Sequence, residues 1–155
     1  MLVYRIDSDR RAENPITGLG AKLYGGRWNE IGIPAVYAAQ HRSLAMLETL
    51  AHVKKTQVFP HNRMIFTILV PDEHIHKIPN NQLRKGWNDI TTYGNTDHIM
   101  RTMMVDQKKL ALLVPSVIVQ EEYNIIIDPG HLGFETVRVV DQKMVEWDRR
   151  MFKTD

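Results

Sequence analysis

The segment AVYAAQHRSLAMLETLAHVKK, residues 35–55, carries the two patterns on which a fold prediction rests. Its first residues are small, β-branched or aromatic, which is typical of a buried strand. After a serine that can cap a helix, apolar side chains recur at helical spacing, and two lysines close the pattern. The segment therefore predicts a strand over 35–39 followed by a helix over 43–55.

Working outward from this segment, strands and helices are mixed without a regular alternation. Further strands are predicted at 2–6, 64–70, 110–114, 117–119, 123–127 and 134–140, and further helices at 96–108 and 144–151. The glycine-rich stretch 7–26 is predicted to be a long loop. This order favours an α+β fold over a doubly wound sheet.

Length and composition limit the classes of protein. The 155 residues fit one domain, so we treat 1–155 as a single domain. A net charge of +2 without a basic run argues against a surface built for nucleic acid or membrane. The absence of cysteine excludes disulfides and cysteine-ligated zinc. Because no apolar stretch has the length of a membrane span and no secretory signal is recognisable, we expect a soluble, cytoplasmic protein.

The densest group of unusual residues is Gly25-Gly26-Arg27-Trp28-Asn29. Paired glycines let the backbone approach a ligand closely or adopt a positive φ. An arginine beside them offers a planar pair of donors to a phosphate or a carboxylate. The same residues are also typical of a glycine turn with a surface arginine and a packing tryptophan, and both interpretations stay open at this point.

Further polar candidates lie on the predicted helix and near the end of the chain. Glu48 borders the apolar stripe of the helix, one turn before His52, and either points into a cleft or is an ordinary solvated helix glutamate. Ser116, Asn124 and Asp128 could present polar groups to a ligand, or serve as routine turn and capping residues. No Gly-x-Ser-x-Gly surrounds Ser116, which argues against a hydrolase nucleophile.

These motifs form an ordered set along nearly the whole chain. The set comprises Gly18-x-Gly20-Ala21, Gly25-Gly26-Arg27-Trp28-Asn29, Gly32, Ala35-x-Tyr37-Ala38, Leu44-Ala45-x-x-Glu48 with His52, Val114-Pro115-Ser116 and Glu122-x-Asn124-Ile125-Ile126-Ile127-Asp128-Pro129. In order and spacing it resembles the RES-domain toxin family. One position departs from the family pattern, because Asp128 stands where an asparagine is expected before the proline. That departure puts a ligand role for position 128 in doubt.

The resemblance implies a fold related to ADP-ribosyltransferase toxins, with a split β core, flanking helices and a cleft for NAD. It implies that the protein is the toxin of a type II toxin–antitoxin system. Such a toxin would be an NAD glycohydrolase, an enzyme that cleaves the nicotinamide–ribose bond of NAD. It also implies a cognate Xre-family antitoxin that covers the active site. NAD is then the substrate, and the reaction needs no metal.

The chemistry of this cleavage agrees with the residues that the resemblance points to. Nicotinamide is cationic in NAD and departs neutral, so a general acid is not required, and one carboxylate suffices where ordinary glycosidases use two. Glu48 would stabilise the oxocarbenium-like state at the ribose. Arg27 would bind the diphosphate or a ribose, and Tyr37 would stack on the nicotinamide ring. The remaining predicted substrate-binding residues are Gly25, Gly26, Ser116 and Asn124.

Other functions stay open at this stage. The same cleft would serve a mono-ADP-ribosyltransferase that modifies a cellular protein. A nucleic-acid-binding or RNA-cleaving toxin is permitted by the mild basicity, although no basic stripe or RNA-binding motif supports it. An inactive relative kept as a binding partner would have no need of Arg27, Tyr37 and Glu48 together. The oligomeric state is undetermined, and a homodimer is compatible with the sequence.

Overall fold

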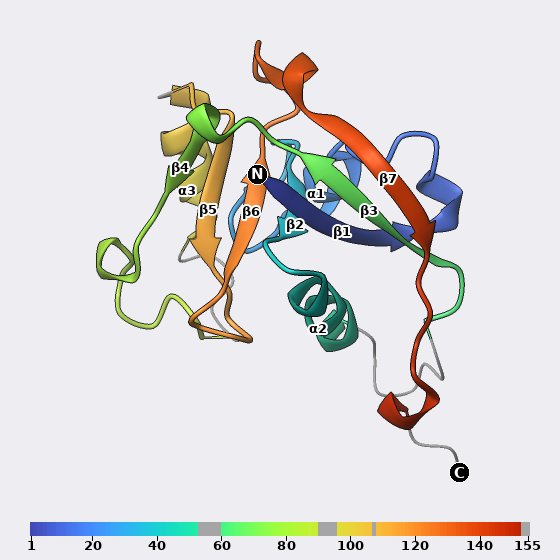
Figure 1. Ribbon diagram of the computed structural model, residues 1–155. Coiled ribbons are helices and arrows are strands. Elements are labelled where there is room, and N and C mark those ends of the chain that lie inside the picture. Colours follow the sequence, from blue (N-terminus) through green and yellow to red (C-terminus); the bar gives the residue numbers. More distant parts are fainter. Residues whose placement is uncertain (53–59, 90–95, 107, 153–155) are drawn as a thin grey trace.

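The computed structural model describes residues 1–52, 60–89, 96–106 and 108–152, and its centre is a seven-stranded sheet (Figure 1). The strands are β1 (Leu2–Ser8), β2 (Val36–Ala39), β3 (Arg63–Leu69), β4 (Ile75–Lys77), β5 (Ala111–Pro115), β6 (Tyr123–Ile127) and β7 (Arg138–Met144). Their order is β4-β5-β6-β2-β1-β3-β7. Neighbouring strands are antiparallel except β4 and β5, which are parallel.

Helices flank this sheet, and the α+β prediction is therefore confirmed. They are α1 (Leu19–Tyr24), α2 (Arg42–His52) and α3 (His98–Met100), the last continued by a π-helix (Arg101–Asp106). Short 3-10 turns lie at Asp9–Arg11, Asp72–His74, Asn80–Gln82, Phe134–Thr136 and Arg149–Met151. Among the described helices, none has the length and apolar character needed to cross a membrane.

The sheet is divided between β1 and β2, as the expected split β core requires. β1 pairs with β3 along its whole length, but with β2 only through Tyr4 and Ala39. Beside that pair, Nη1 of Arg5 donates to the backbone carbonyl of Tyr37 at 2.9 Å. A strand carbonyl inside the protein needs a hydrogen-bond partner. A side chain thus supplies one of the links between the two halves of the sheet.

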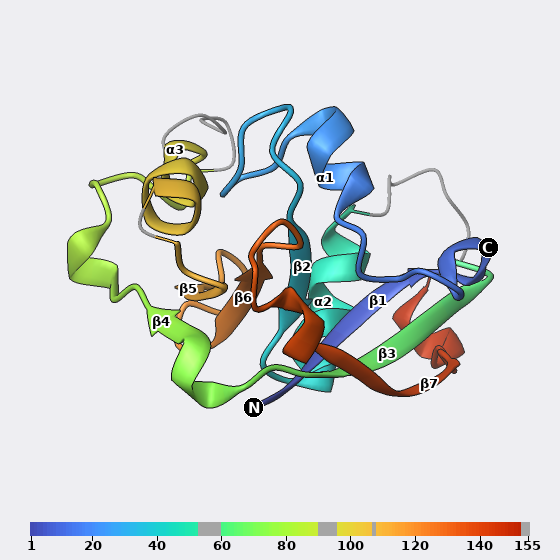
Figure 2. The ribbon, with the colours of Figure 1, turned by 90° about the horizontal axis from the view of Figure 1, so that it is seen from above.

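Two apolar clusters cover the opposite faces of the half-sheet that contains β2 and β6. Alternate residues of each strand point to opposite faces, so Val36 and Ala38 enter one cluster while Tyr37 packs against the other. A third cluster joins Leu44 and Ala45 of α2 to Ala39. Helix α2 therefore packs against the sheet at β1 and β2 (Figures 1 and 2). The split in the sheet and the helix that carries Glu48 are therefore adjacent.

Elements with a clear local pattern lie where the sequence predicts them. The predicted strands at 2–6, 35–39, 64–70, 110–114 and 123–127 correspond to β1, β2, β3, β5 and β6. The predicted helix over 43–55 is α2, with residues 53–55 outside the described part of the chain. The helix predicted over 96–108 is shorter, because its described turns run from His98 to Asp106. The long loop predicted at 7–26 is wrong in part, since it contains α1.

The strand predicted over 117–119 is wrong. Those apolar residues form a turn between β5 and β6, and the hydroxyl of Ser116 explains it. Ser116 Oγ accepts the backbone N–H groups of Ile118 at 3.0 Å and Val119 at 3.2 Å. A side chain that captures backbone donors in this way offers the chain an alternative to a sheet ladder.

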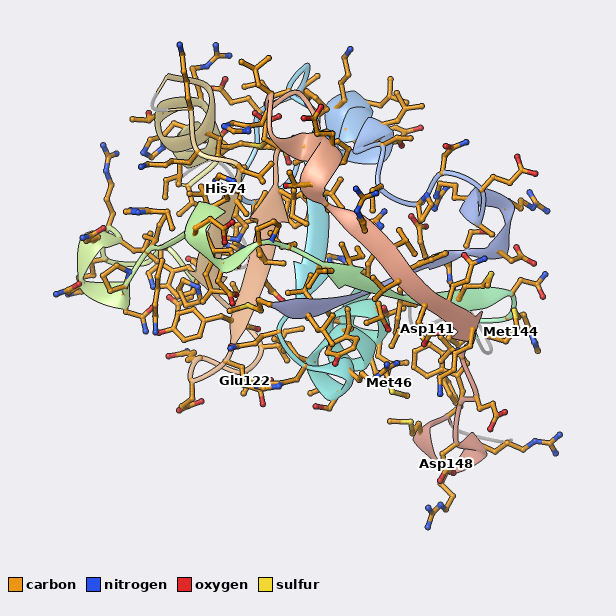
Figure 3. All side chains as sticks on the ribbon, turned by 45° about the horizontal axis from the view of Figure 1, so that its top comes forward. Met46, His74, Glu122, Asp141, Met144 and Asp148 are labelled. Carbon is orange, nitrogen blue, oxygen red and sulfur yellow. The ribbon has the colours of Figure 1, made fainter. Side chains whose placement is uncertain are left out.

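The predictions for the last part of the chain are wrong in part, because only residues 138–140 of the strand predicted over 134–140 lie in a strand. The structure has a 3-10 turn at Phe134–Thr136 and begins β7 at Arg138, and residues 144–151 are not a helix. Met144 still pairs with Met64 of β3, and the indole N–H of Trp147 donates to the Pro60 carbonyl at 3.1 Å. Figure 3 shows Asp141 and Met144 along β7, with Asp148 on the segment that follows. The backbone of Met144 and Val145 pairs with β3, and this pairing replaces the helix predicted to begin at Met144.

Candidate functional site

Glu48 is an anchored acidic side chain near the split in the sheet. It lies on α2, partly buried, and its Oε1 accepts hydrogen bonds from Ser116 Oγ at 2.8 Å and Asn124 Nδ2 at 2.6 Å. Ser116 follows β5 and Asn124 lies on β6, and the pairing of these strands brings both residues to the helix. Both donors use the same oxygen, Oε1. Glu48 is thus not an ordinary solvated helix glutamate.

Ser116 and Asn124 were predicted to bind substrate, and the structure shows another contact for both. Ser116 is fully buried, and its hydroxyl holds Glu48 while it also accepts two backbone N–H groups of its turn. Asn124 also lines two cavities that both border Glu48. Hydrogen bonds to an ionised carboxylate are short and strong. Both residues therefore fix the orientation of Glu48, and direct contact with substrate stays a prediction.

Tyr37 connects the sheet to the Gly25–Asn29 motif. Its hydroxyl donates to Asn29 Oδ1 at 2.7 Å and accepts from the backbone N–H of Trp28 at 3.1 Å. Asn29 is buried, and its Nδ2 contacts three backbone carbonyls nearby. Burial raises the pKa of Tyr37 well above its usual value, against the opposing effect of its hydrogen bonds. Tyr37 is therefore a neutral phenol in the folded protein.

The glycine pair has a packing reason of its own. A Cβ at Gly26 would lie 2.5 Å from the Tyr37 hydroxyl oxygen and 2.8 Å from Asn29 Oδ1, so a larger residue would displace this contact. Gly25 ends α1 with a φ of +69°, a conformation that favours glycine. Trp28 is buried against Trp87, with ring centroids 5.7 Å apart. The packing interpretation of this motif thus holds for its glycines and its tryptophan, and a ligand role for the glycines stays a prediction.

Arg27 is anchored to a turn that is distant in sequence. Its Nη1 donates to the carbonyls of Trp87 at 2.7 Å and Asp89 at 3.2 Å. Its own carbonyl accepts the hydroxyl of Thr96 at 2.6 Å. Arg27 also lines the larger of the two cavities at the site. The side chain is therefore fixed at the wall of the cavity, and its contact with NAD stays a prediction.

Two cavities meet at Glu48. The larger one, of about 880 Å³, extends from the Gly25–Trp28 segment to the turn after β5. The smaller one, of about 320 Å³, lies between α2 and the split of β1 and β2. Both volumes fall within the range of small-molecule sites. The residues that line both cavities are Tyr37, Glu48, His52 and Asn124.

A family model described as the RES domain matches residues 2–148 of this chain. The chain belongs to the RES-domain family. It is 38% identical over 157 residues to the Prs ADP-ribosylating toxin of Sphingobium sp. (strain YBL2), covering 97% of this chain and 96% of that protein. It is 35% identical over 136 residues to Toxin Res of Yersinia enterocolitica serotype O:8 / biotype 1B, covering 88% and 89% respectively.

A solved structure shows the same fold at low sequence identity. A chain of the M. tuberculosis MbcT–MbcA toxin–antitoxin complex superposes with a TM-score of 0.71 at 17% identity. The match covers 97% of this RES domain and 85% of that chain. The expected α+β fold, a split β core with flanking helices, is thus confirmed and is shared with a chain of that complex.

The RES domain holds a charged group that the sequence analysis missed. Asp7, on β1, is buried, and its carboxylate is shared by Arg5 and Arg11. Burial alone would raise the pKa of Asp7, but the Arg11 hydrogen bond and the Arg5 charge bring it below its ordinary value. Arg5 and Asp7 are two apart on a strand and so share a face, which the sequence could have indicated. The contact with Arg11 depends on the turn after β1.

His52 and Asp128 differ in whether they line the cavities at Glu48. His52 lies one turn further along α2 and lines both cavities. Asp128 lies at the end of β6, lines neither cavity, and accepts the Gly130 N–H at 2.8 Å. Burial raises the pKa of Asp128. Within the described part of the chain, no three His, Asp or Glu side chains gather as a metal site would require.

Proposed function

We propose that this RES domain is the toxin of a toxin–antitoxin system and that it hydrolyses the nicotinamide–ribose bond of NAD. The observation that carries the proposal is the Glu48 carboxylate, held through one oxygen by Ser116 and Asn124 where two cavities meet. The printed names of the relatives support it, because they are toxins and one is an ADP-ribosylating toxin. NAD is the ADP-ribose donor that such a reaction uses.

The reaction follows from the charge of the substrate. When the bond between the ribose carbon and the nicotinamide nitrogen breaks, its electron pair leaves with a neutral nicotinamide. Positive charge then develops on the ribose, and the carboxylate of Glu48 stabilises it. A water oxygen forms the new bond to the same carbon and releases one proton. The products are ADP-ribose, nicotinamide and the proton.

The shape of the site suits this substrate. The larger cavity has the volume for a dinucleotide, and Arg27 is fixed at its wall. The smaller cavity adds room on the other side of Glu48. The ring of Tyr37 borders both, and we expect it to contact the nicotinamide ring as proposed from the sequence. Because its hydroxyl already bonds to Asn29 and Trp28, Tyr37 contributes a fixed aromatic surface.

Transfer of ADP-ribose to a protein is the second candidate. A relative at 38% identity is named as a toxin that ADP-ribosylates Prs, which favours this alternative. The bond that breaks and the role of Glu48 are the same in both reactions. They differ only in whether water or an acceptor side chain attacks the ribose.

A protein partner follows from the proposed toxin function. The solved structure with the same fold comes from a toxin–antitoxin complex. We therefore propose a cognate antitoxin, of the Xre family by the sequence resemblance, that covers the cavities at Glu48. Growth arrest on expression of this chain, relieved by the antitoxin encoded beside it, is the expected cellular result.

The deciding experiment measures nicotinamide and free ADP-ribose released from NAD by the purified protein and by Glu48→Gln. The substitution removes the charge with almost no change in shape, and we expect it to lower turnover by at least about a hundredfold. Glu73→Gln, on an exposed 3-10 turn, is the matched control and should retain full activity.

Equal amounts of nicotinamide and ADP-ribose establish hydrolysis. Release of nicotinamide only when an acceptor protein is added, with label on that protein, establishes transfer. A Glu48→Gln variant that is as active as the wild type contradicts the proposed role of the carboxylate. Absence of both reactions in the folded wild-type protein, with acceptor present, contradicts the proposed function.

A further inference from the structure

A second arginine, outside every motif singled out in the sequence, stands at the larger cavity. Arg11 lies on the 3-10 turn after β1 and lines this cavity together with the Gly25–Trp28 segment. Its Nε donates to Asp7 Oδ1 at 2.8 Å, and its Nη2 contacts the same oxygen. These two bonds hold one edge of the guanidinium and leave Nη1 directed away from the carboxylate. The Arg11 side chain is 58% exposed.

The charges around Asp7 do not cancel. Its single carboxylate contacts two guanidinium groups, Arg5 and Arg11, and also accepts the backbone N–H of Ser8. Arg5 is directed into the split of the sheet, where it donates to the Tyr37 carbonyl, and it is 22% exposed. Two positive charges and one negative charge leave a net positive charge in this group. Because Arg11 is the exposed member, that charge is presented at the cavity.

A positively charged side chain such as Arg11 is expected at the cavity if its ligand is a dinucleotide. A diphosphate carries two negative charges and is bound in proteins by arginine pairs, backbone N–H groups or both. Arg27 is already anchored to the carbonyls of Trp87 and Asp89. Glu48, the acidic residue among those lining the cavity, would repel phosphate at its own end. Phosphate is therefore best placed beside the exposed guanidinium of Arg11.

We propose that Arg11 binds the diphosphate of NAD and that Asp7 is the positioning residue that holds Arg11 for it. The proposal rests on the function proposed above and names a ligand-binding residue of the same site. Asp7 restricts an otherwise flexible side chain before the ligand arrives, which lowers the entropy lost on binding. Its own burial and its bond to Ser8 fix its place on β1.

The test is a comparison of ligands that differ in phosphate content. Calorimetry gives the affinity of the wild type and of Arg11→Ala for ADP and adenosine, and for NAD in the Glu48→Gln background, where turnover is suppressed. We expect Arg11→Ala to weaken binding of NAD and of ADP by about tenfold or more, while the affinity for adenosine does not change. Affinity for ADP should also become less sensitive to salt, because one charge–charge contact is lost. A merely structural role of Arg11 would lower all three affinities together.

Arg10 offers a matched control on the same turn. Its side chain is exposed, and the bond described for it uses only its backbone N–H, to Ser8 Oγ. Arg10→Ala removes the same charge one residue away and should leave all three affinities unchanged. Arg11→Gln, which keeps a donor for Asp7 without the charge, serves if Arg11→Ala lowers the melting temperature. It should show the same selective loss of ADP binding.

The outcomes separate this proposal from the function on which it rests. If the wild type binds NAD and both Arg11 variants bind ADP equally well, the role of Arg11 is overturned and the proposed function stands. An equal loss in Arg10→Ala and Arg11→Ala points to a general charge effect and also overturns it. If the folded wild type binds neither NAD nor ADP, both proposals fail.

Discussion

At the scale of single residues, the carboxylate of Glu48 depends on partners that lie 68 and 76 positions away in sequence. Ser116 and Asn124 both donate to Oε1, and we propose that the other oxygen contacts the substrate. Ser116 also accepts two backbone N–H groups of the turn between β5 and β6, so its replacement would disturb the backbone as well. Asn124 is therefore the residue through which the positioning of Glu48 is best tested.

We expect Asn124→Ala to lower kcat for NAD cleavage by about tenfold to a hundredfold, because a hydrogen bond to a charged group is lost. If positioning is its main role, the dissociation constant for NAD changes little. If direct binding of substrate is its main role, that constant rises instead. Steady-state kinetics and calorimetry distinguish the two results, and Asn81→Ala on the surface is the control.

Asp128 provides a test of stability at a position that departs from the family pattern. Its pKa is raised in the folded state by burial, so its ionised form costs stability at pH values above its ordinary pKa. Asp128→Asn removes the charge and retains an oxygen for the Gly130 N–H. We expect a higher melting temperature than the wild type at pH 7, with the difference shrinking as the pH falls towards 3.8.

The exposed Asp141→Asn variant on β7 is the control for this measurement and should show no such pH-dependent gain. A lower melting temperature for Asp128→Asn at pH 7 would show that the carboxylate has a favourable partner in the folded state.

At the scale of elements, the contact between β2 and the Gly25–Asn29 segment positions one wall of the site. The Tyr37 hydroxyl occupies the space where a Cβ at Gly26 would lie, and it bonds to Trp28 and Asn29. The glycine therefore permits the aromatic ring, the arginine beside it and the sheet to lie close together. This explains the pattern of the motif through packing within the protein.

We expect Gly26→Ala to destabilise the protein by about 1–3 kcal/mol, the usual cost of overpacking a closely packed site. Gly20→Ala is the matched control, because a Cβ at Gly20 on α1 meets nothing within 4 Å. It should leave stability unchanged or raise it slightly, since alanine has the higher helix propensity. Urea denaturation of both variants measures the difference, and equal stabilities would contradict this explanation.

At the scale of the whole molecule, a charged group centred on the buried Asp7 lies near the join of the two half-sheets. Arg5 reaches across the split to Tyr37 and is itself held by Asp7, which also holds Arg11. The one pairing between β1 and β2, Tyr4 with Ala39, provides little backbone bonding there. Side-chain contacts thus help to join the two halves, and Arg5 and Arg11 each line one of the two cavities.

We expect Asp7→Asn to destabilise the protein by about 1.5–3 kcal/mol at pH 7, because Arg5, which is 22% exposed, loses its carboxylate partner. The pKa of Asp7 is lowered in the folded state, so its contribution is present above 3.8 and is lost as the pH falls through the folded value. The difference between wild type and variant should therefore narrow in acid. Urea unfolding from pH 7 to pH 2 measures it, and a constant difference would contradict the assignment.

How much of this molecule could be predicted depends on whether the determining contacts are local. The pattern of residues 35–55 was enough to predict β2 and α2, because apolar periodicity is a property of the segment itself. The ordered motifs were likewise enough to indicate the RES family and the prominence of Glu48. The strand prediction for residues 117–119 failed because it rested on apolar character alone. In the structure the Ser116 hydroxyl accepts two backbone N–H groups of this segment and holds it in a turn.

The sequence by itself thus determined the family, the half-sheet strands with strong periodicity and the helix that bears Glu48. Only the tertiary structure decided that Ser116 and Asn124 converge on that carboxylate and that Arg11 reaches the larger cavity. It also decided that residues around Met144 extend β7, because their backbone groups pair with β3 across the sheet. These outcomes depend on which segments meet in space, and hydrogen bonds between distant strands and side chains are not encoded in the periodicity of either partner.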